Sequence, residues 1–341
     1  MGAVLGYIAT LGVYFFIYNI FCLGLNIQFG YAGILDFTVI TFMAIAGYFA
    51  GVAVLGPPQR GSEIFYILGL NLPWPIALVI GVVAAGTLGF LIGLVALRRL
   101  RSDYLAIVTL ASGSIVYGIV NNDNKIFDGA AGLVGVPQPY TSIFGFNPNT
   151  YTWYFLIICA VMMLLCWFVA ERIYRSPLGR TMRAIREDMD VAEAFGKDAF
   201  RVRMLAMVLG CMMVGVGGVL TLAYVSALSP AGWSTGETFV IWAALIVGGR
   251  ANNLGAIVGS FLVAVLFNEA TRFLPTIPGD PNLISNIRNM CIGGLVILTL
   301  WLRPQGVIPE RKARFAELPT AAKRRPPGES LVTLGSVDSV G

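Results

Sequence analysis

The chain of 341 residues is 57% hydrophobic and only 12% charged, with a formal net charge of +5 and a mean hydropathy of +0.78. This composition excludes an ordinary soluble domain and indicates an integral membrane protein. The chain has no histidine, and its five cysteines lie in apolar stretches without C-x-x-C spacing. The sequence therefore offers no metal-binding pattern and lacks the commonest proton-relay side chain.

Long stretches without Asp, Glu, Lys or Arg follow one another along the chain. A helix needs about 20 apolar residues to cross roughly 30 Å of hydrocarbon, whereas strands of a membrane barrel alternate polar and apolar residues. The sequence therefore predicts an all-α integral membrane protein, a polytopic bundle of about nine transmembrane helices (a range of about 8 to 10). These are expected near 5–27, 37–56 and 76–97, and within 104–122, 129–170, 204–228, 237–249, 251–268 and 283–302.

Most of the 23 Lys and Arg residues lie in three segments, 98–101, 172–203 and 303–325. The positive-inside rule places such segments in the cytoplasm. The N-terminus and the loop 121–150, which is rich in Asn, Gly and Pro, are then expected outside the cell.

Two regions follow from this arrangement. Residues 1–302 are predicted to form a transmembrane permease domain that carries a cytoplasmic loop at 171–203. Residues 303–341 hold Pro, Gly, Ser and charge without apolar periodicity, which predicts a flexible cytoplasmic tail. For the basic cluster at 323–325, a solvated topology anchor is favoured over a lipid-binding patch.

Residues 180–203 contain six basic and five acidic side chains. Placing these charges near the bilayer centre, at about 2.5 to 3.5 kcal/mol each, would cost on the order of 30 kcal/mol, so the segment must lie in water. Ser176 and Pro177 mark a helix start, and Gly196 a helix end. Apolar residues recur between them at helical spacing, namely Met182, Ile185, Met189, Ala192 and Phe195.

The spacing predicts a short amphipathic helix with one apolar face. That face either packs on the chain's own helices or the membrane surface, or fits a groove on a cytoplasmic partner. The residues alone leave both interpretations open.

The stretch SPLGRTMRAIREDMDVAEAFGKDAFRVRMLA (176–206) resembles the cytoplasmic loop of permease subunits of ABC-type importers, in the branched-chain amino-acid family and its urea and amide relatives. Glu193, Ala194 and Gly196, with Phe195 between them, match the E-A-A…G coupling motif of that loop. Further similar stretches keep the family order: LNIQFGYAGILDFTVITFMAIAGYFAG (25–51), RSDYLAIVTLASGSIV (101–116), DGAAGLVGVP (128–137), LIVGGRANNLGAIVGSFLVAVL (245–266) and WLRPQGVIP (301–309). The chain departs from the family pattern at Asp36, Thr38 and Val39 and in DGAAGL (128–133), segments that bear on solute choice.

The resemblance implies a membrane-spanning permease subunit of an ATP-driven importer, for branched-chain amino acids or related small polar solutes, working by alternating access. Such a chain is not an enzyme and carries no cofactor of its own. The sequence agrees, because no G-x-x-x-x-G-K-[ST] phosphate loop occurs in it. The implied partners are cytoplasmic ABC ATPase subunits, a second permease subunit (homologous or identical), an external solute-binding protein and membrane lipid, but no nucleic acid. The implied location is the inner membrane of a bacterium.

The resemblance also assigns candidate residues. Coupling to the ATPase is expected from Arg186, Glu187, Asp188, Met189, Ala192, Glu193, Ala194, Phe195 and Gly196. Polar residues in or near apolar stretches are candidates for the translocation path: Asn26, Gln28, Asp36, Asn121, Asn122, Asn268 and Glu269. Glycine pairs in G-x-x-x-G spacing, Gly47/Gly51, Gly89/Gly93 and Gly255/Gly259, are expected to pack helices within the chain.

Two alternatives remain at this stage. A permease for urea or short amides would share the same pattern. A self-sufficient secondary transporter or channel would use the charged segment only as a topology anchor, and it would transport solute without any ATPase.

Overall fold

The computed structural model describes residues 2–57, 66–99, 102–141, 148–233, 235–267 and 283–310. The first half of the chain forms α1 (Gly2–Leu25), the π-helical turn η1 (Asn26–Tyr31), α2 (Val39–Val54), α3 (Trp74–Arg99), α4 (Ser102–Asn122) and α5 (Asn124–Phe127). The second half forms α7 (Pro148–Arg175), α8 (Pro177–Glu187), α9 (Met189–Ala194), α10 (Ala199–Val225), η2 (Pro230–Gly232), α11 (Thr235–Gly248), α12 (Asn253–Gly259), η3 (Ser260–Phe267) and α14 (Leu283–Leu302).

The described residues form helices and no strand; their only β-pairing is two isolated bridges, Tyr66 with Phe127 and Leu133 with Leu228. In the part of the chain that the structure describes, five helices are long and apolar enough to cross a membrane, by length and composition: Val4–Tyr31, Trp74–Arg98, Tyr104–Asn122, Thr150–Arg175 and Ala199–Val225. Shorter apolar helices accompany them. The predicted helical membrane bundle is confirmed, and its count of about nine crossings stays a prediction.

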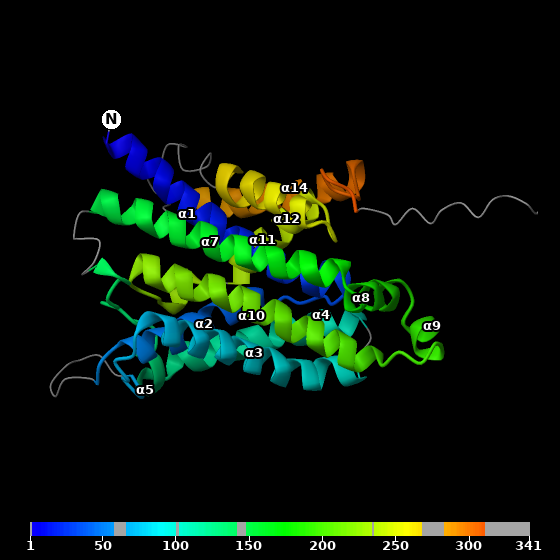
Figure 1. The fold of residues 1–341 in the computed structure, drawn as a ribbon, viewed down its shortest axis with the longest axis horizontal. Helices are drawn as coiled ribbons and strands as arrows, with labels where there is room; N and C mark the ends of the chain where they lie inside the picture. Colours follow the sequence, from blue (N-terminus) through cyan, green and yellow to red (C-terminus); the bar gives the residue numbers. More distant parts are fainter. Residues whose placement is uncertain are drawn as a thin grey trace, which may run out of the picture. The chain divides into compact units, whose positions relative to one another are not determined.

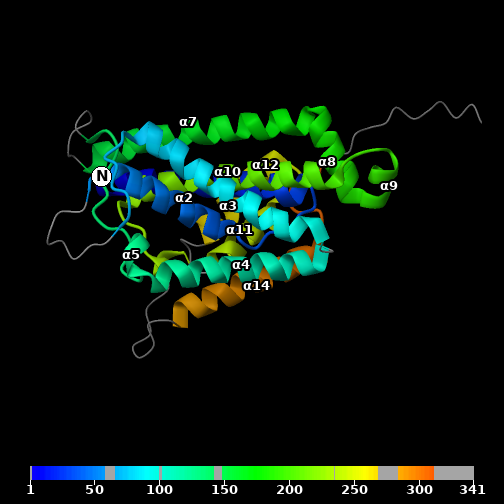
Figure 2. The same ribbon diagram turned by 90° about the horizontal axis from the view of Figure 1, so that it is seen from below.

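α10 lies at the centre of the bundle, where it packs against α1, α2 and α3 (Figures 1 and 2). Small residues permit this close packing. A Cβ on Gly259 would lie 1.9 Å from the carbonyl oxygen of Ala244, so α11 and α12 touch through their backbones. The other predicted glycine pairs also contact neighbouring helices, which confirms packing within the chain.

α8 and α9 extend beyond the ends of α7 and α10 (Figure 1). We call this end of the bundle the α8 end. The chain enters the segment from α7 and leaves it into α10, so both connections are direct. The charged stretch up to Asp198 therefore lies beyond the ends of the long helices, as its insertion cost requires.

The first residues of the predicted tail pack on the bundle. After α14, the backbone N–H of Gly306 bonds to the carbonyl of Arg303, and the chain turns back toward the end of α11. There the N–H groups of Val307 and Ile308 donate to the carbonyls of Val247 and Gly248 at 2.8 and 3.0 Å. These carbonyls end α11 and have no partner within that helix, so residues 303–310 cap it. The rest of the predicted tail, 311–341, lies outside the described residues.

Candidate functional site

The segment at the α8 end is divided by capping residues. The Ser176 hydroxyl accepts from the N–H of Gly179 at the start of α8, with Pro177 as the first helical residue. The Asp188 carboxylate accepts from the N–H of Val191 and starts α9. Gly196 has a φ of +75° and ends α9, where the N–H of Lys197 bonds to the carbonyl of Ala192. The predicted start and end are confirmed, but the single helix expected between them is two helices, because Asp188 adopts an extended conformation.

This break divides the predicted apolar face. Met182, Ile185 and Ala192 are buried within the chain, which is the outcome expected if the face packs on the chain's own helices. Met189 and Phe195 lie on the surface, and the Phe195 side chain is 80% exposed. The prediction of one continuous apolar face was therefore wrong: the buried residues hold the segment in place, and Met189 and Phe195 of the same predicted face are exposed.

Arg186 connects α8 to two other parts of the chain. Its guanidinium donates through Nη1 to the carbonyl oxygen of Gly30 in η1. Through Nη2 it donates to both carboxylate oxygens of Glu310, at 2.9 and 3.1 Å. The two side chains are only 16% and 27% exposed, so solvent screens this pair less than it would a surface ion pair.

The other predicted coupling residues are exposed. Glu187, Asp188, Glu193, Ala194 and Gly196 lie on the surface of α8 and α9 or at their ends. A Cβ on Gly196 would meet no atom within 4 Å. The segment thus offers a mixed charged and apolar surface.

The chain is not helical between η1 and α2, which agrees with the gap between the helices predicted near 5–27 and 37–56. The sequence did not predict the contacts that hold this break. Gly33 has a φ of +66°, and a Cβ there would lie 2.9 Å from the Arg186 Cγ, so the turn and its contact with α8 both favour glycine. Side chains of other helices form hydrogen bonds with backbone groups that have no helical partner in this break. Thr109 accepts from the N–H of Phe37, and Trp242 donates to the carbonyl of Asp36. Buried backbone groups outside a helix are stable only when other groups of the protein form hydrogen bonds with them in this way.

A buried polar network joins this region to the start of α12. The Asn253 Oδ1 accepts from Asn26 Nδ2 at 3.1 Å and from the Tyr31 hydroxyl at 2.5 Å. The Asn253 Nδ2 donates to the Glu171 carboxylate at 2.9 Å, and Asn26 Oδ1 accepts from the N–H of Ala251. Elements far apart in the sequence are thus held together by one asparagine.

The predicted path residues lie in different places. Asn26, Gln28 and Asp36 are fully buried and bond to the chain's own groups; Gln28 donates to the carbonyl of Met207 at 3.2 Å, and Asp36 accepts from the N–H of Thr38 at 2.8 Å. Asn121 and Asn122 lie at the far end of α4, away from the first three. Asn268 and Glu269 lie outside the described residues. A role in translocation stays a prediction for all of them.

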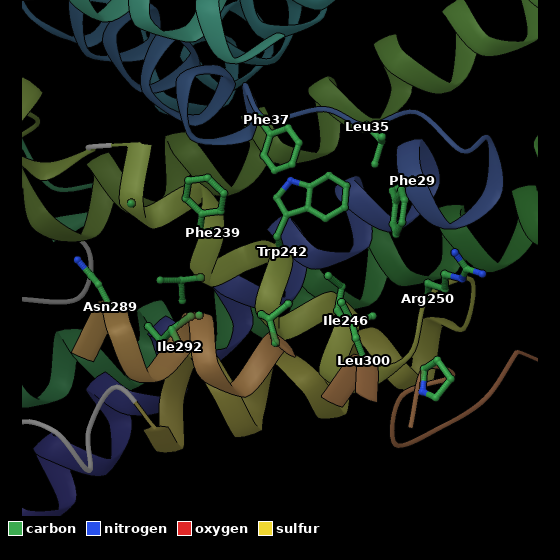
Figure 3. Close-up of a pocket in the computed structure, with 15 residues that line it drawn as sticks. Phe29, Leu35, Phe37, Phe239, Trp242, Ile246, Arg250, Asn289, Ile292 and Leu300 are labelled. Atoms are coloured by element: carbon green, nitrogen blue, oxygen red, sulfur yellow. The ribbon is translucent and has the colours of Figure 1, made fainter. Parts of the chain in front are cut away.

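A pocket of about 680 Å³ lies beside the break (Figure 3). Phe29, Leu35 and Phe37 line one side, α14 lines the other, and α11 contributes Phe239 and Trp242 between them. The Trp242 ring stacks on Phe37, with ring centroids 4.9 Å apart. Arg250 lies at one end of this pocket, in the turn between α11 and α12, and Asn289 at the other. The pocket is therefore mainly aromatic and aliphatic, with one cationic side chain at its edge.

Sequence reasoning did not find Asn253, Glu310 or Trp242. Asn253 and Glu310 stand in ordinary polar contexts, and Trp242 is one of many aromatic residues in an apolar chain. The adjacent Gly248 and Gly249 were a weak signal, because they end α11 beside the pocket.

The long apolar helices and the charged segment beyond their ends together define a multi-pass helical membrane protein. Residues 7–300 match the family described as the permease component of branched-chain amino acid transport systems. The chain therefore belongs to this permease family, as its sequence indicated.

Individual relatives agree with the family match. The LivM permease protein of the high-affinity branched-chain amino acid transport system of Escherichia coli is 31% identical over 93% of this chain and 72% of its own length. The probable LivM permease of Methanocaldococcus jannaschii is 28% identical over 89% of this chain and 94% of its own. The probable LivH permease of the same organism is 26% identical over 68% and 72%. No solved structure matches the chain significantly.

Proposed function

We propose that this chain is the membrane-spanning subunit of an ATP-driven importer for branched-chain amino acids and that it moves solute by alternating access. The names of its relatives support the solute class. One structural observation carries the coupling to ATP hydrolysis, namely the α8 and α9 segment, whose buried part anchors it to the bundle and whose exposed part carries apolar side chains.

The exposed part is suited to bind another protein. Met189, Val191 and Phe195 are exposed on α9 and at its end, on a segment whose charges keep it in water. Burying one large apolar side chain contributes about 1.5 to 3 kcal/mol. A groove on a cytoplasmic ATPase that accepts Phe195 would therefore gain affinity from it, and the surrounding charges would select the partner.

The remaining partners follow from the same proposal. The concentration of basic residues near the α8 end supports a cytoplasmic position for it, in the inner membrane of a bacterium. ATP would be bound by the ATPase subunits. A second permease subunit would complete the path, and an external binding protein would deliver solute at the opposite end.

We place the solute cavity of this chain at the pocket between η1, α11 and α14. Its aromatic and aliphatic lining suits a branched aliphatic side chain, and Arg250 at its edge suits a carboxylate. The helix breaks after η1 and after α11 both lie beside it, as is common at transporter binding sites.

Reconstitution of the chain in vesicles with its ATPases, second permease and binding protein tests the proposal. Leucine, isoleucine and valine should stimulate ATP hydrolysis and uptake, whereas urea and acetamide should not. Phe195→Ser should leave the chain folded but weaken ATPase association, while Val134→Ser, which changes an exposed apolar residue at the opposite end, should not.

Three results would contradict the proposal. Uptake by the chain alone, driven by an ion or solute gradient, would favour a secondary transporter or channel. Stimulation by urea or acetamide alone would favour the amide permeases. Unchanged ATPase association in Phe195→Ser would remove the role of α9.

A further inference from the structure

The two contacts of Arg186 reach opposite sides of the pocket. Gly30 follows Phe29 directly, and Phe29 lines the side formed by η1 and the break. Glu310 lies on the segment that continues from α14. α14 lines the other side of the pocket, and Pro304 of this segment lines the pocket as well. A single side chain of α8 therefore connects the two segments that carry the pocket walls.

We propose that Arg186 is a positioning residue that joins α8 to both walls of the pocket, so that displacement of α8 changes the opening of the pocket at the α8 end. This inference rests on the proposed function and adds to it a named mechanical link, with Glu310 as its second half. A guanidinium suits this position better than an ammonium, because its planar fork presents one N–H group to the carbonyl and bonds to both carboxylate oxygens at once.

The surroundings make the link stiff. On the first side, Arg186 lies against the turn at Gly33, so α8 cannot shift toward η1 without moving the break. On the second side, Glu310 belongs to a segment held by backbone bonds to the end of α11 and by Asn252, whose amide donates to the Pro309 carbonyl at 2.9 Å. A movement of α8 is thus passed to packed elements on both sides, as coupling between distant sites requires.

Two other ion pairs among the described residues differ from this one. Arg175 pairs with Glu171 within α7, and Arg201 pairs with Asp198 at the start of α10. Both pairs join residues three or four positions apart, whereas Arg186 and Glu310 are 124 positions apart. Of these pairs, the Arg186–Glu310 pair is the one that connects α8 to the α14 side of the pocket.

Three variants of the full reconstituted complex test the link. Glu310→Gln keeps the shape of the side chain but removes its charge. Arg186→Lys keeps the charge but cannot present the planar fork of donors. Arg303→Gln is the control, because it removes a charge from the same segment. The Arg303 side chain is exposed and belongs to none of the three ion pairs described above.

Two readouts separate positioning from a general structural effect. The first is the number of solute molecules transported per ATP hydrolysed. The second is the rate at which maleimide labels a cysteine placed at Phe239, a half-exposed pocket residue, with and without trapped ATP. The labelling uses a Cys291→Ser background, because Cys291 is exposed and the other four cysteines are buried.

In the complex without substitutions at Arg186, Glu310 or Arg303, trapped ATP should change the labelling rate. In Glu310→Gln the transported solute per ATP should fall about fivefold or more, the lower end of measured coupling between sites, and the ATP-dependent change in labelling should disappear. Arg186→Lys should give a transport ratio and a labelling response between those of Glu310→Gln and the unsubstituted complex. Arg303→Gln should match the unsubstituted complex in both, and ATPase association should persist in all three variants.

Two results would overturn the inference while leaving the proposed function intact. One is an unchanged transport ratio and labelling response in Glu310→Gln. The other is an equal loss in Glu310→Gln and Arg303→Gln, which would indicate a general effect of charge. Failure of the unsubstituted chain to assemble with ATPases would instead overturn the proposed function, and the link with it.

Discussion

Asn253 offers the sharpest test of how this bundle is held together. It is 4% exposed and forms side-chain hydrogen bonds to Asn26, Tyr31 and Glu171. Asn253→Leu keeps the branched shape and the number of heavy atoms of the side chain but removes all three bonds. Asn26 and Tyr31 are fully buried, so water cannot replace the lost partner.

The expected cost follows from these contacts. At an average of about 0.6 kcal/mol per side-chain hydrogen bond in membrane proteins, three bonds amount to about 2 kcal/mol. At about 1 to 3 kcal/mol for each buried polar group left unpaired, the loss at Asn26 and Tyr31 reaches about 2 to 6 kcal/mol. We therefore expect the free energy of unfolding to fall by about 2 to 5 kcal/mol.

Unfolding of the purified chain by dodecyl sulfate in mixed micelles measures this quantity. The matched control is Asn122→Leu, which also removes an asparagine amide, but one that is exposed and donates only within its own helix, to Gly118 at 2.8 Å. Its effect should stay within about 0.5 kcal/mol. If both substitutions lower the free energy of unfolding equally, the network does not hold α12 to η1 as argued.

Two further predictions concern glycines. Gly196 has a left-handed φ of +75° and open space around its Cβ position. Gly196→Val should therefore lower uptake per ATP hydrolysed, whereas Gly196→Asn should nearly preserve it, because asparagine tolerates that φ. Equal uptake in both variants would rule out the backbone explanation. Gly293 and Gly294 are adjacent on α14 and a Cβ on either meets no atom within 4 Å, but of the two only Gly293 lines the pocket. Gly293→Phe should therefore block uptake and Gly294→Phe should not, with similar thermal stability in both variants. Uptake unaffected by Gly293→Phe would exclude the pocket from the solute path.

Features that depend on neighbouring residues could be predicted from the sequence. Helix formation in a membrane depends on the hydropathy of about 20 consecutive residues, so most apolar helices were found within a few residues of their bounds. The exception is α7 (Pro148–Arg175), for which only the wide range 129–170 was predicted from the sequence. Helix ends depend on cap residues nearby, so Ser176, Pro177 and Gly196 were assigned correctly. The exclusion of residues 180–203 from the bilayer followed from charge alone.

The sequence predicted a gap between the first two helices, but it could not predict the contacts that hold the break after η1. Residues 32–38 are as apolar as a helix interior, apart from Asp36 and Thr38. They depart from helical geometry because Thr109 and Trp242, on two other helices, bond their backbone groups. A local pattern contains no information on such partners.

The sequence by itself determined that this chain is a helical membrane protein with a water-exposed charged segment, because hydropathy and insertion cost are sums over neighbouring residues. Only the tertiary structure decided which side of that segment faces inward. Met182, Ile185 and Ala192 turn toward the bundle, while Phe195 does not. It also decided that Arg186 meets Gly30 and Glu310, since partners so distant in the chain meet only through the packing of the whole bundle.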